Sequence, residues 1–159
     1  MKEASNTKVT ANNKIIKGIA ALWVVWAIFH IFPGIIAMVF AINGDISSIE
    51  MLEPASQADM LAADYPAAVS AILAQLGQHA FNLFWFGIVA FVCAVYIWRF
   101  GSQTAMLIAA LVAGFADLGV IFFIDIIGGY TSVFGSLIVA VGFLAIGLSV
   151  YTFKRPALG

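Results

Sequence analysis

Residues 18–42 read GIAALWVVWAIFHIFPGIIAMVFAI and contain no Asp, Glu, Lys or Arg. A helix needs about 20 apolar residues to cross the roughly 30 Å of hydrocarbon in a bilayer. Three further stretches meet this requirement, at about residues 80–98, 104–127 and 131–153. Their apolar runs are continuous rather than alternating, which favours helices over the strands of a barrel. The sequence therefore predicts an all-α membrane protein, a four-transmembrane-helix antiparallel bundle that forms a single membrane domain over residues 1–159.

The composition excludes several other classes of protein. Of the 159 residues, 64% are hydrophobic and 9% are charged. Soluble domains average about 45–50% apolar residues and about 25% charged residues. A net charge of −1 gives no excess of positive charge for phosphates, so we expect no nucleic-acid partner. The single cysteine, Cys93, excludes an internal disulfide, and no Cys/His spacing indicates a metal site.

The distribution of charge predicts the orientation of the chain. The basic residues fall in the N-terminal tail, at Arg99, and at Lys154 and Arg155. With four spans these places share one face of the membrane, and the positive-inside rule makes that face cytoplasmic. The 43–78 loop carries acidic residues and no Lys or Arg. We therefore expect both termini to be cytoplasmic and the 43–78 loop to lie outside. The length of the first apolar stretch indicates an uncleaved anchor rather than a signal peptide.

The connections between the spans differ in length. Ser47 to Glu50 form a capping box, which predicts a short helix ending at Pro54 within a structured outer loop. An apolar stripe that follows Pro66 predicts that the second helix begins there, ahead of its membrane span. The turns at residues 99–103 and 128–130 are short, so helices two, three and four should be antiparallel neighbours.

Small residues recur at helical spacing in three of the spans. Helices in lipid associate through such residues, because lipid tails are as apolar as leucine. The stripes are Ala20, Trp23, Ala27, His30, Gly34, Ala37 and Ala41 in the first helix, Ala110, Ala113 and Gly114 in the third, and Gly135, Gly142 and Ser149 in the fourth. We interpret them as the faces that pack the bundle. Contacts through helices one and four in a homo-oligomer or a larger membrane complex are the alternative.

Few polar groups lie within the predicted spans, and ionisable groups there are costly enough to be functional hypotheses by default. They are His30, Asp117 and Asp125, with Asn82 and His79 near the outer end of helix two. At 1.5 Å per residue from the basic face, His30 and Asp117 both lie at a depth of about 20 Å. We therefore predict that these two side chains meet in a polar centre. Asp125, about 80° around the helix from Asp117, would lie with Asn82 and His79 in a funnel above it.

Three interpretations of this polar centre remain open. A buried hydrogen bond between His30 and Asp117 would fix the register of the helices without any chemistry. A pocket between helices would bind a lipid-like or quinone-like molecule. Proton exchange would serve a small membrane enzyme or a proton-coupled carrier for a lipid-soluble substrate. Haem or metal ligation by His30 and His79 is disfavoured, because their depths differ by most of half a bilayer.

Short segments of the chain resemble the small four-helix bacterial inner-membrane proteins of the DoxX-like type. These segments are the basic residues that precede residues 21–39, His30 followed by Gly34, the Phe84-Trp85-Phe86-Gly87 segment, and Arg99 after the second span. The resemblance covers the whole layout. It implies the bacterial inner (plasma) membrane and favours a quinone-related or accessory role.

We therefore expect an accessory subunit or hydrophobic-ligand binder that is not an enzyme, in contact with membrane lipid. No cofactor is expected beyond a bound lipid or quinone. The alternatives are an enzyme or carrier that uses His30 and Asp117, and a purely structural subunit of a larger membrane assembly.

Overall fold

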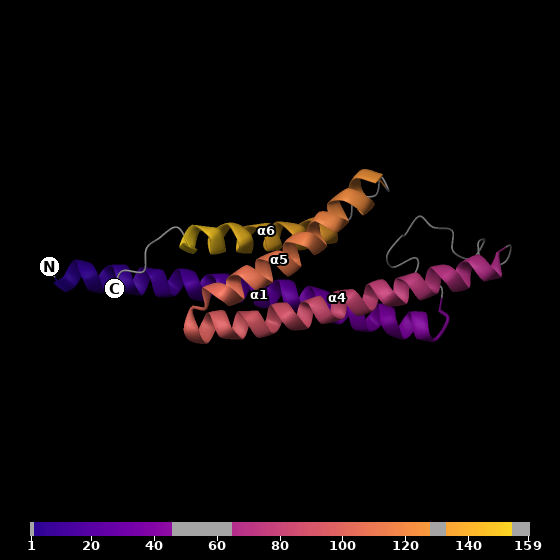
Figure 1. The fold of residues 1–159 in the computed structure, drawn as a ribbon, viewed down its shortest axis with the longest axis horizontal. Coiled ribbons are helices and arrows are strands. Elements are labelled where there is room, and N and C mark those ends of the chain that lie inside the picture. Colours follow the sequence, from indigo (N-terminus) through magenta and orange to yellow (C-terminus); the bar gives the residue numbers. More distant parts are fainter. Residues whose placement is uncertain (1, 46–64, 128–132, 154–159) are drawn as a thin grey trace. The chain divides into compact units, whose positions relative to one another are not determined.

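Apart from short turns and helix ends, the chain is helical in the part that its structure, a computed structural model, describes. That part comprises residues 2–45, 65–127 and 133–153, with the backbone alone for residues 2–12, 124, 125 and 134. The elements are α1 (Lys2–Ile42), α4 (Pro66–Phe100), α5 (Gln103–Gly119), the π-helix η1 (Val120–Ile127) and α6 (Val133–Phe153) (Figure 1).

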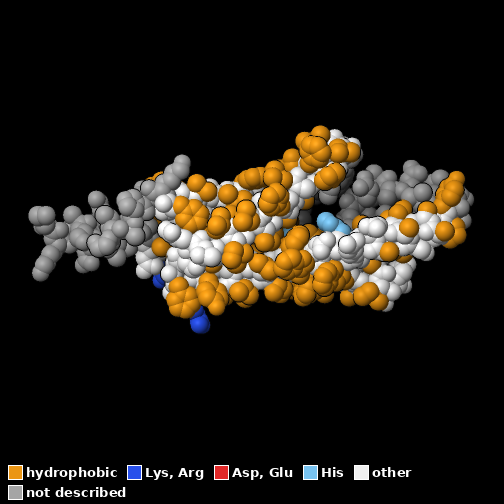
Figure 2. All heavy atoms as spheres, viewed as in Figure 1, with side chains coloured by type: hydrophobic (Ala, Val, Ile, Leu, Met, Phe, Trp, Pro, Cys, Tyr) orange, Lys and Arg blue, Asp and Glu red, His pale blue; other side chains and the backbone are white. Residues whose placement is uncertain are grey.

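Four of these helices are long and apolar enough to cross a membrane. The qualifying segments are Asn13–Ile42, Pro66–Phe100, Gln103–Phe123 and Gly135–Phe153. Hydrophobic side chains cover much of the face shown in Figure 2. Large apolar side chains such as Phe32 and Phe115 are 61% and 74% exposed, and such a surface needs a cover of lipid or protein. These are the properties of an integral membrane protein.

The helix bounds differ from the sequence prediction mainly at the start of the chain. α1 begins at Lys2 rather than near residue 18, so the helix includes the basic tail. α4 begins at Pro66, where the sequence places its start, and Val69 and Leu73 of the predicted stripe are buried. The predicted helix from Ser47 to Pro54 and the turn at 128–130 lie outside the described residues.

The turn between α4 and α5 is shorter than predicted and consists of Gly101 and Ser102 alone. Gly101 has a φ of 60°, a left-handed conformation that costs other residues free energy. Its N–H donates to the Ile97 carbonyl at 2.9 Å, which closes α4. The Ser102 hydroxyl accepts from the Ala105 N–H at 3.2 Å, which caps α5.

The chain divides into two compact units. Unit 1 comprises Met1–Ile28 and Ile88–Gly159, and unit 2 comprises Phe29–Gly87. Helices α1 and α4 therefore contribute to both units, whereas α5, η1 and α6 belong to unit 1 alone.

The core of unit 1 is formed by α1, the end of α4, α5 and α6. On α1 the buried residues include Ala20, Trp23 and Ala27 of the predicted stripe, which confirms that this stripe is a packing face. On α5 the buried face is rotated from the prediction, since Ala110 and Gly114 are half-buried. The buried residues of α5 are Ala105, Met106, Ala109, Ala113 and Asp117, which follow steps of about four residues.

Unit 2 is held by a close approach of α1 to α4. A Cβ atom placed on Gly34 would lie 2.7 Å from the backbone nitrogen of Phe84 and 2.8 Å from the carbonyl oxygen of Ala80. A Cβ on Gly77 would lie 3.3 Å from the Cβ of Ala41. Small residues therefore let the two backbones touch, as expected for helices that associate in lipid.

Candidate functional site

Asp117 lies at the end of the buried face of α5. The side chain is 1% exposed although it is ionisable. Ala109 and Ala113 precede it at four-residue intervals on the same face of the helix. Because these neighbours are small, α1 and α6 can approach α5 closely enough to enclose the carboxyl group.

Trp26 of α1 supplies the hydrogen bonds to this carboxyl group. Its Nε1 donates to both oxygens of Asp117, at 3.2 Å and 3.3 Å. The Trp26 side chain is completely buried, and Trp23 packs against it edge to face with 6.3 Å between the ring centroids. Trp26 is therefore fixed by packing and positioned to satisfy a buried polar group on another helix.

Gly142 of α6 closes the third side of the site. A Cβ atom placed on Gly142 would overlap Oδ2 of Asp117 and would lie 3.1 Å from Nε1 of Trp26. The backbone of α6 therefore packs directly on the hydrogen-bonded pair. We call Asp117, Trp26, Trp23 and Gly142 the Asp117 centre, which joins α1, α5 and α6 within unit 1.

Trp23 brings an unpaired polar atom into the Asp117 centre. Nε1 of Trp23 is buried and has no hydrogen-bond partner in the part of the chain that the structure describes. Burial of an unpaired donor costs free energy. The apolar packing of two indoles therefore has to offset this cost.

The buried hydroxyl groups of α6 bond mainly within their own helix. The Ser149 hydroxyl donates to the Ala145 carbonyl at 2.7 Å, and the Thr152 hydroxyl donates to the Ser149 carbonyl at 2.7 Å. Thr152 also lies 3.5 Å from the sulfur of Met106 on α5. These hydroxyls are consistent with packing of α6 against α5 and suggest no reactive group.

The remaining predicted site residues are divided between the two units. His30, Asn82 and His79 belong to unit 2, where His30 is buried, Asn82 half-buried and His79 exposed. Gly34, one helical turn beyond His30, touches the backbone of α4 at Ala80 and Phe84, on either side of Asn82. Asp117 belongs to unit 1. The predicted contact between His30 and Asp117 therefore stays a prediction.

Asp125 lies in η1, and its side chain is outside the described residues. Its predicted position, about 80° around the helix from Asp117, assumed 3.6 residues per turn. In the π-helix Val120–Ile127 the backbone bonds reach five residues instead of four. The angular estimate for Asp125 is therefore wrong, because the intervening segment is not an α-helix.

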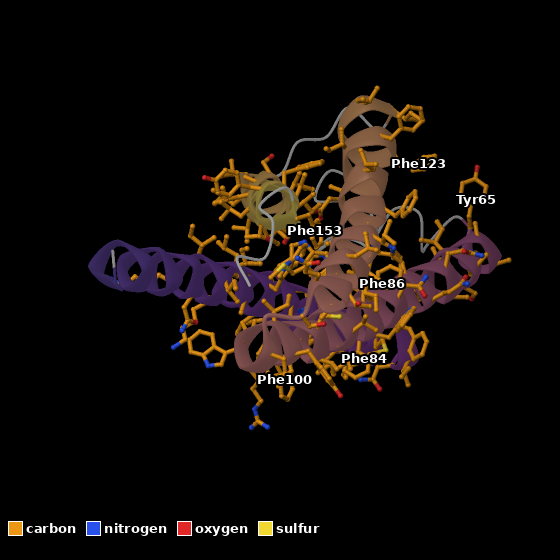
Figure 3. All side chains as sticks on the ribbon, turned by 60° about the vertical axis from the view of Figure 1, so that its left-hand side comes forward. Tyr65, Phe84, Phe86, Phe100, Phe123 and Phe153 are labelled. Carbon is orange, nitrogen blue, oxygen red and sulfur yellow. The ribbon has the colours of Figure 1, made fainter. Side chains whose placement is uncertain are left out.

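Sequence reasoning missed Trp26 as the partner of Asp117. The available signal was an indole N–H within an apolar span, which needs an acceptor. Residue counts from the basic face place Trp26 at a depth of about 14 Å and Asp117 at about 21 Å, so these counts predict no contact between them. Figures 1 and 3 show that the continuous α5–η1 helix is inclined to α1. Phe123, near the end of that helix, lies far from Phe100, the last residue of α4. Counts along inclined helices do not measure a common depth.

The chemistry of the Asp117 centre is that of a hydrogen-bonded contact between helices. An indole N–H donates but does not accept a proton, so Trp26 and Asp117 are not an acid–base pair. Among the side chains that the structure describes, no group of three His, Cys, Asp or Glu residues is placed to hold a metal ion.

Unit 2 contains a groove between the end of α1 and the start of α4. The groove has a volume of about 390 Å³, is shallow, and is open over most of its surface. It is lined by Ala41, Ile42, Gly44, Ser70, Leu73, Ala74 and Gly77. Its volume is within the range of small-molecule sites, and its lining is mostly apolar.

Comparison of the chain with models of protein families, with curated proteins and with solved structures finds no match.

Proposed function

We propose that this chain is a non-catalytic integral membrane protein of the bacterial inner membrane, an accessory subunit or a binder of hydrophobic ligands. In this proposal the Asp117 centre holds α1, α5 and α6 together and performs no chemistry. The observation that supports it most is the pairing of a 1%-exposed carboxyl group with a donor-only indole.

The proposal includes an antiparallel bundle with both termini cytoplasmic and the 43–78 loop outside. Its support is the placement of basic residues at the N-terminal tail, at Arg99 and at the C-terminus, with acidic residues alone in the loop. A relationship to DoxX-like proteins belongs to the same proposal and rests on the segments that carry the resemblance.

The function of the Asp117 centre is tested with an isosteric variant. Asp117→Asn keeps an oxygen that accepts from Trp26 but cannot exchange a proton as a carboxyl group does. We expect this variant to enter membranes in the normal amount and to unfold near the wild-type temperature in detergent. We also expect that the wild-type chain moves no protons in vesicles loaded with a pH-sensitive dye.

The opposite outcome would favour the enzyme or carrier instead. If wild-type vesicles show proton uptake, and Asp117→Asn abolishes it without lowering the unfolding temperature, Asp117 is part of a reaction path. A His30→Gln variant with the same effect would add His30 to that path.

The groove of unit 2 supports the ligand-binding form of the proposal. A short-chain ubiquinone analogue is the probe, and its affinity for the purified chain is measured in detergent. Ala74→Phe fills the groove and should weaken binding by at least about tenfold, because the site loses its volume. Ala71→Phe is the matched control, since Ala71 is exposed on the same helix and does not line the groove. Equal affinity in both variants would exclude the groove as the site.

A further inference from the structure

One end of unit 1 combines basic and aromatic side chains. Lys14 and Lys17 lie three residues apart on α1, so they share a face of the helix. Arg99 lies in the last turn of α4, directly after Trp98. All four side chains are exposed. We call Lys14, Lys17, Trp98 and Arg99 the basic–aromatic end.

Contacts within unit 1 bring the two helices together at this end. Nζ of Lys17 lies over the ring of Trp98, 5.5 Å from its centroid, a cation–π distance. A Cβ atom on Gly101 would lie 3.4 Å from Cδ1 of Ile16. The start of the apolar part of α1 therefore lies beside the end of α4 and the turn that follows it. Lys17 contacts Trp98, and Arg99 is the next residue of α4.

Within unit 1, no described acidic side chain lies against this positive charge. Asp117 is the one acidic residue of unit 1 whose side chain the structure describes. Its oxygens bond to Trp26, away from Lys17 and Arg99. Figure 2 shows blue basic side chains at one end of a surface that is otherwise largely hydrophobic.

The aromatic side chains place this end at a membrane surface. Trp98 and Tyr96 are both 53% exposed, and Tyr96 packs against the exposed Phe100 with 5.7 Å between centroids. Exposed Trp and Tyr at the end of an apolar helix are typical of the headgroup level of a bilayer. Cations at that level face lipid phosphates rather than water alone.

We propose that the basic–aromatic end binds the headgroup of an anionic phospholipid. Lys17 and Arg99 donate to the phosphate, Lys14 adds positive charge, and the acyl chains lie along the apolar faces of α1 and α4. Ammonium and guanidinium groups form charge-assisted hydrogen bonds to phosphate. The cation–π contact holds Lys17 against the end of α4 that carries Arg99. This proposal requires that the chain is inserted in a membrane. It does not depend on the proposed orientation or on any role of Asp117.

The experiment measures which lipids the chain retains. The full chain is reconstituted in vesicles of equimolar phosphatidylcholine and phosphatidylglycerol, extracted in mild detergent, and its bound lipids are quantified by mass spectrometry. We expect wild-type chain to retain phosphatidylglycerol in preference to phosphatidylcholine. In Lys17→Gln/Arg99→Gln this preference should fall by about tenfold or more.

A charge-matched variant separates a site from a general effect of charge. Lys154→Gln/Arg155→Gln removes the same two residue types elsewhere and should keep the preference. Equal loss in the two variants, or no preference in the wild type, overturns the proposal. Trp98→Leu should reduce the preference by severalfold, because it removes the contact that positions Lys17.

Two further measurements use the wild-type chain and do not depend on how the variants fold. Washing at high ionic strength should weaken retention of phosphatidylglycerol, because screening reduces the attraction of exposed charges. Inorganic phosphate at a concentration equal to the lipid should not displace it, because the ion lacks acyl chains. Retention that is insensitive to salt contradicts the proposal, and displacement by phosphate shows a site for the free ion instead.

Discussion

The hydrogen bond between Trp26 and Asp117 joins α1 to α5 through two buried side chains. A carboxyl group in an apolar span is costly unless a donor satisfies it. Trp26 provides one donor to both oxygens at 3.2 Å and 3.3 Å. Contacts of this kind between membrane helices contribute about 0.6 kcal/mol on average and up to about 1.7 kcal/mol. The contact therefore determines which faces of α1 and α5 meet more than it determines total stability.

A double-mutant cycle measures this contact. Trp26→Phe, Asp117→Leu and the double variant are compared with the wild type by unfolding in detergent. We expect a coupling energy of about 1 kcal/mol, because each single variant removes the same hydrogen bond. Trp85→Phe is the control on an exposed indole and should show no coupling to Asp117→Leu. Additive effects of the two substitutions would mean that the contact contributes nothing.

Gly142 leaves no room for a side chain beside Asp117. Gly142→Ala should lower the free energy of unfolding by about 1–3 kcal/mol, because its Cβ overlaps a carboxylate oxygen that Trp26 holds in place. Gly147→Ala on the same helix has nothing within 4 Å of its Cβ. It should leave stability unchanged or raise it, since alanine favours helix. Thermal unfolding of the two variants makes the comparison, and equal effects would contradict the packing described for α6.

At the scale of the elements, α1 and α4 pack backbone to backbone at Gly34. A Cβ there would meet three backbone atoms of α4, which cannot rotate away as a side chain can. Gly34→Ala should therefore lower the free energy of unfolding by about 1–3 kcal/mol. Gly18→Ala is the control, because Gly18 lies on the same helix with nothing within 4 Å. The unfolding free energies in detergent are compared, and a neutral Gly34→Ala would show that the two backbones do not touch.

The sequence predicts the helices well because each one is marked by a long apolar run of consecutive residues. Each span is an apolar run of about 20 residues, and Pro66 marks the start of α4 by its suitability for a first helical turn. The start of α1 at Lys2 has no such signal, since the tail is polar. The turn of Gly101 and Ser102 is shorter than residues 99–103, because Arg99 and Phe100 remain helical although the apolar run has ended.

The candidate site is predicted only in part. Asp117 and the Ala20, Trp23 and Ala27 face follow from residue type and spacing, and both are buried. Trp26 does not, because its pairing with Asp117 depends on the inclination of α5, which no local pattern specifies. The π-helix also has no recognised signal in VIFFIDII, so the direction of Asp125 cannot be extrapolated from Asp117.

At the scale of the whole molecule, the proposed orientation follows from basic residues alone and is tested by labelling. In a Cys93→Ala background, single cysteines replace Ser5 in the N-terminal tail or Ser56 in the 43–78 loop. A membrane-impermeant maleimide applied to intact cells should label Ser56→Cys and should not label Ser5→Cys until the membrane is permeabilised. Labelling of Ser5→Cys in intact cells would reverse the orientation.

The two-residue connection of α4 and α5 has a consequence for how the protein is made. Gly101 and Ser102 extend over about 7 Å at most, so the end of α4 and the start of α5 must stay at the same level of the membrane. We therefore expect α4 and α5 to enter the membrane together, as one hairpin. A hydrophilic epitope placed between Gly101 and Ser102 would uncouple that joint entry and reduce the yield of mature protein.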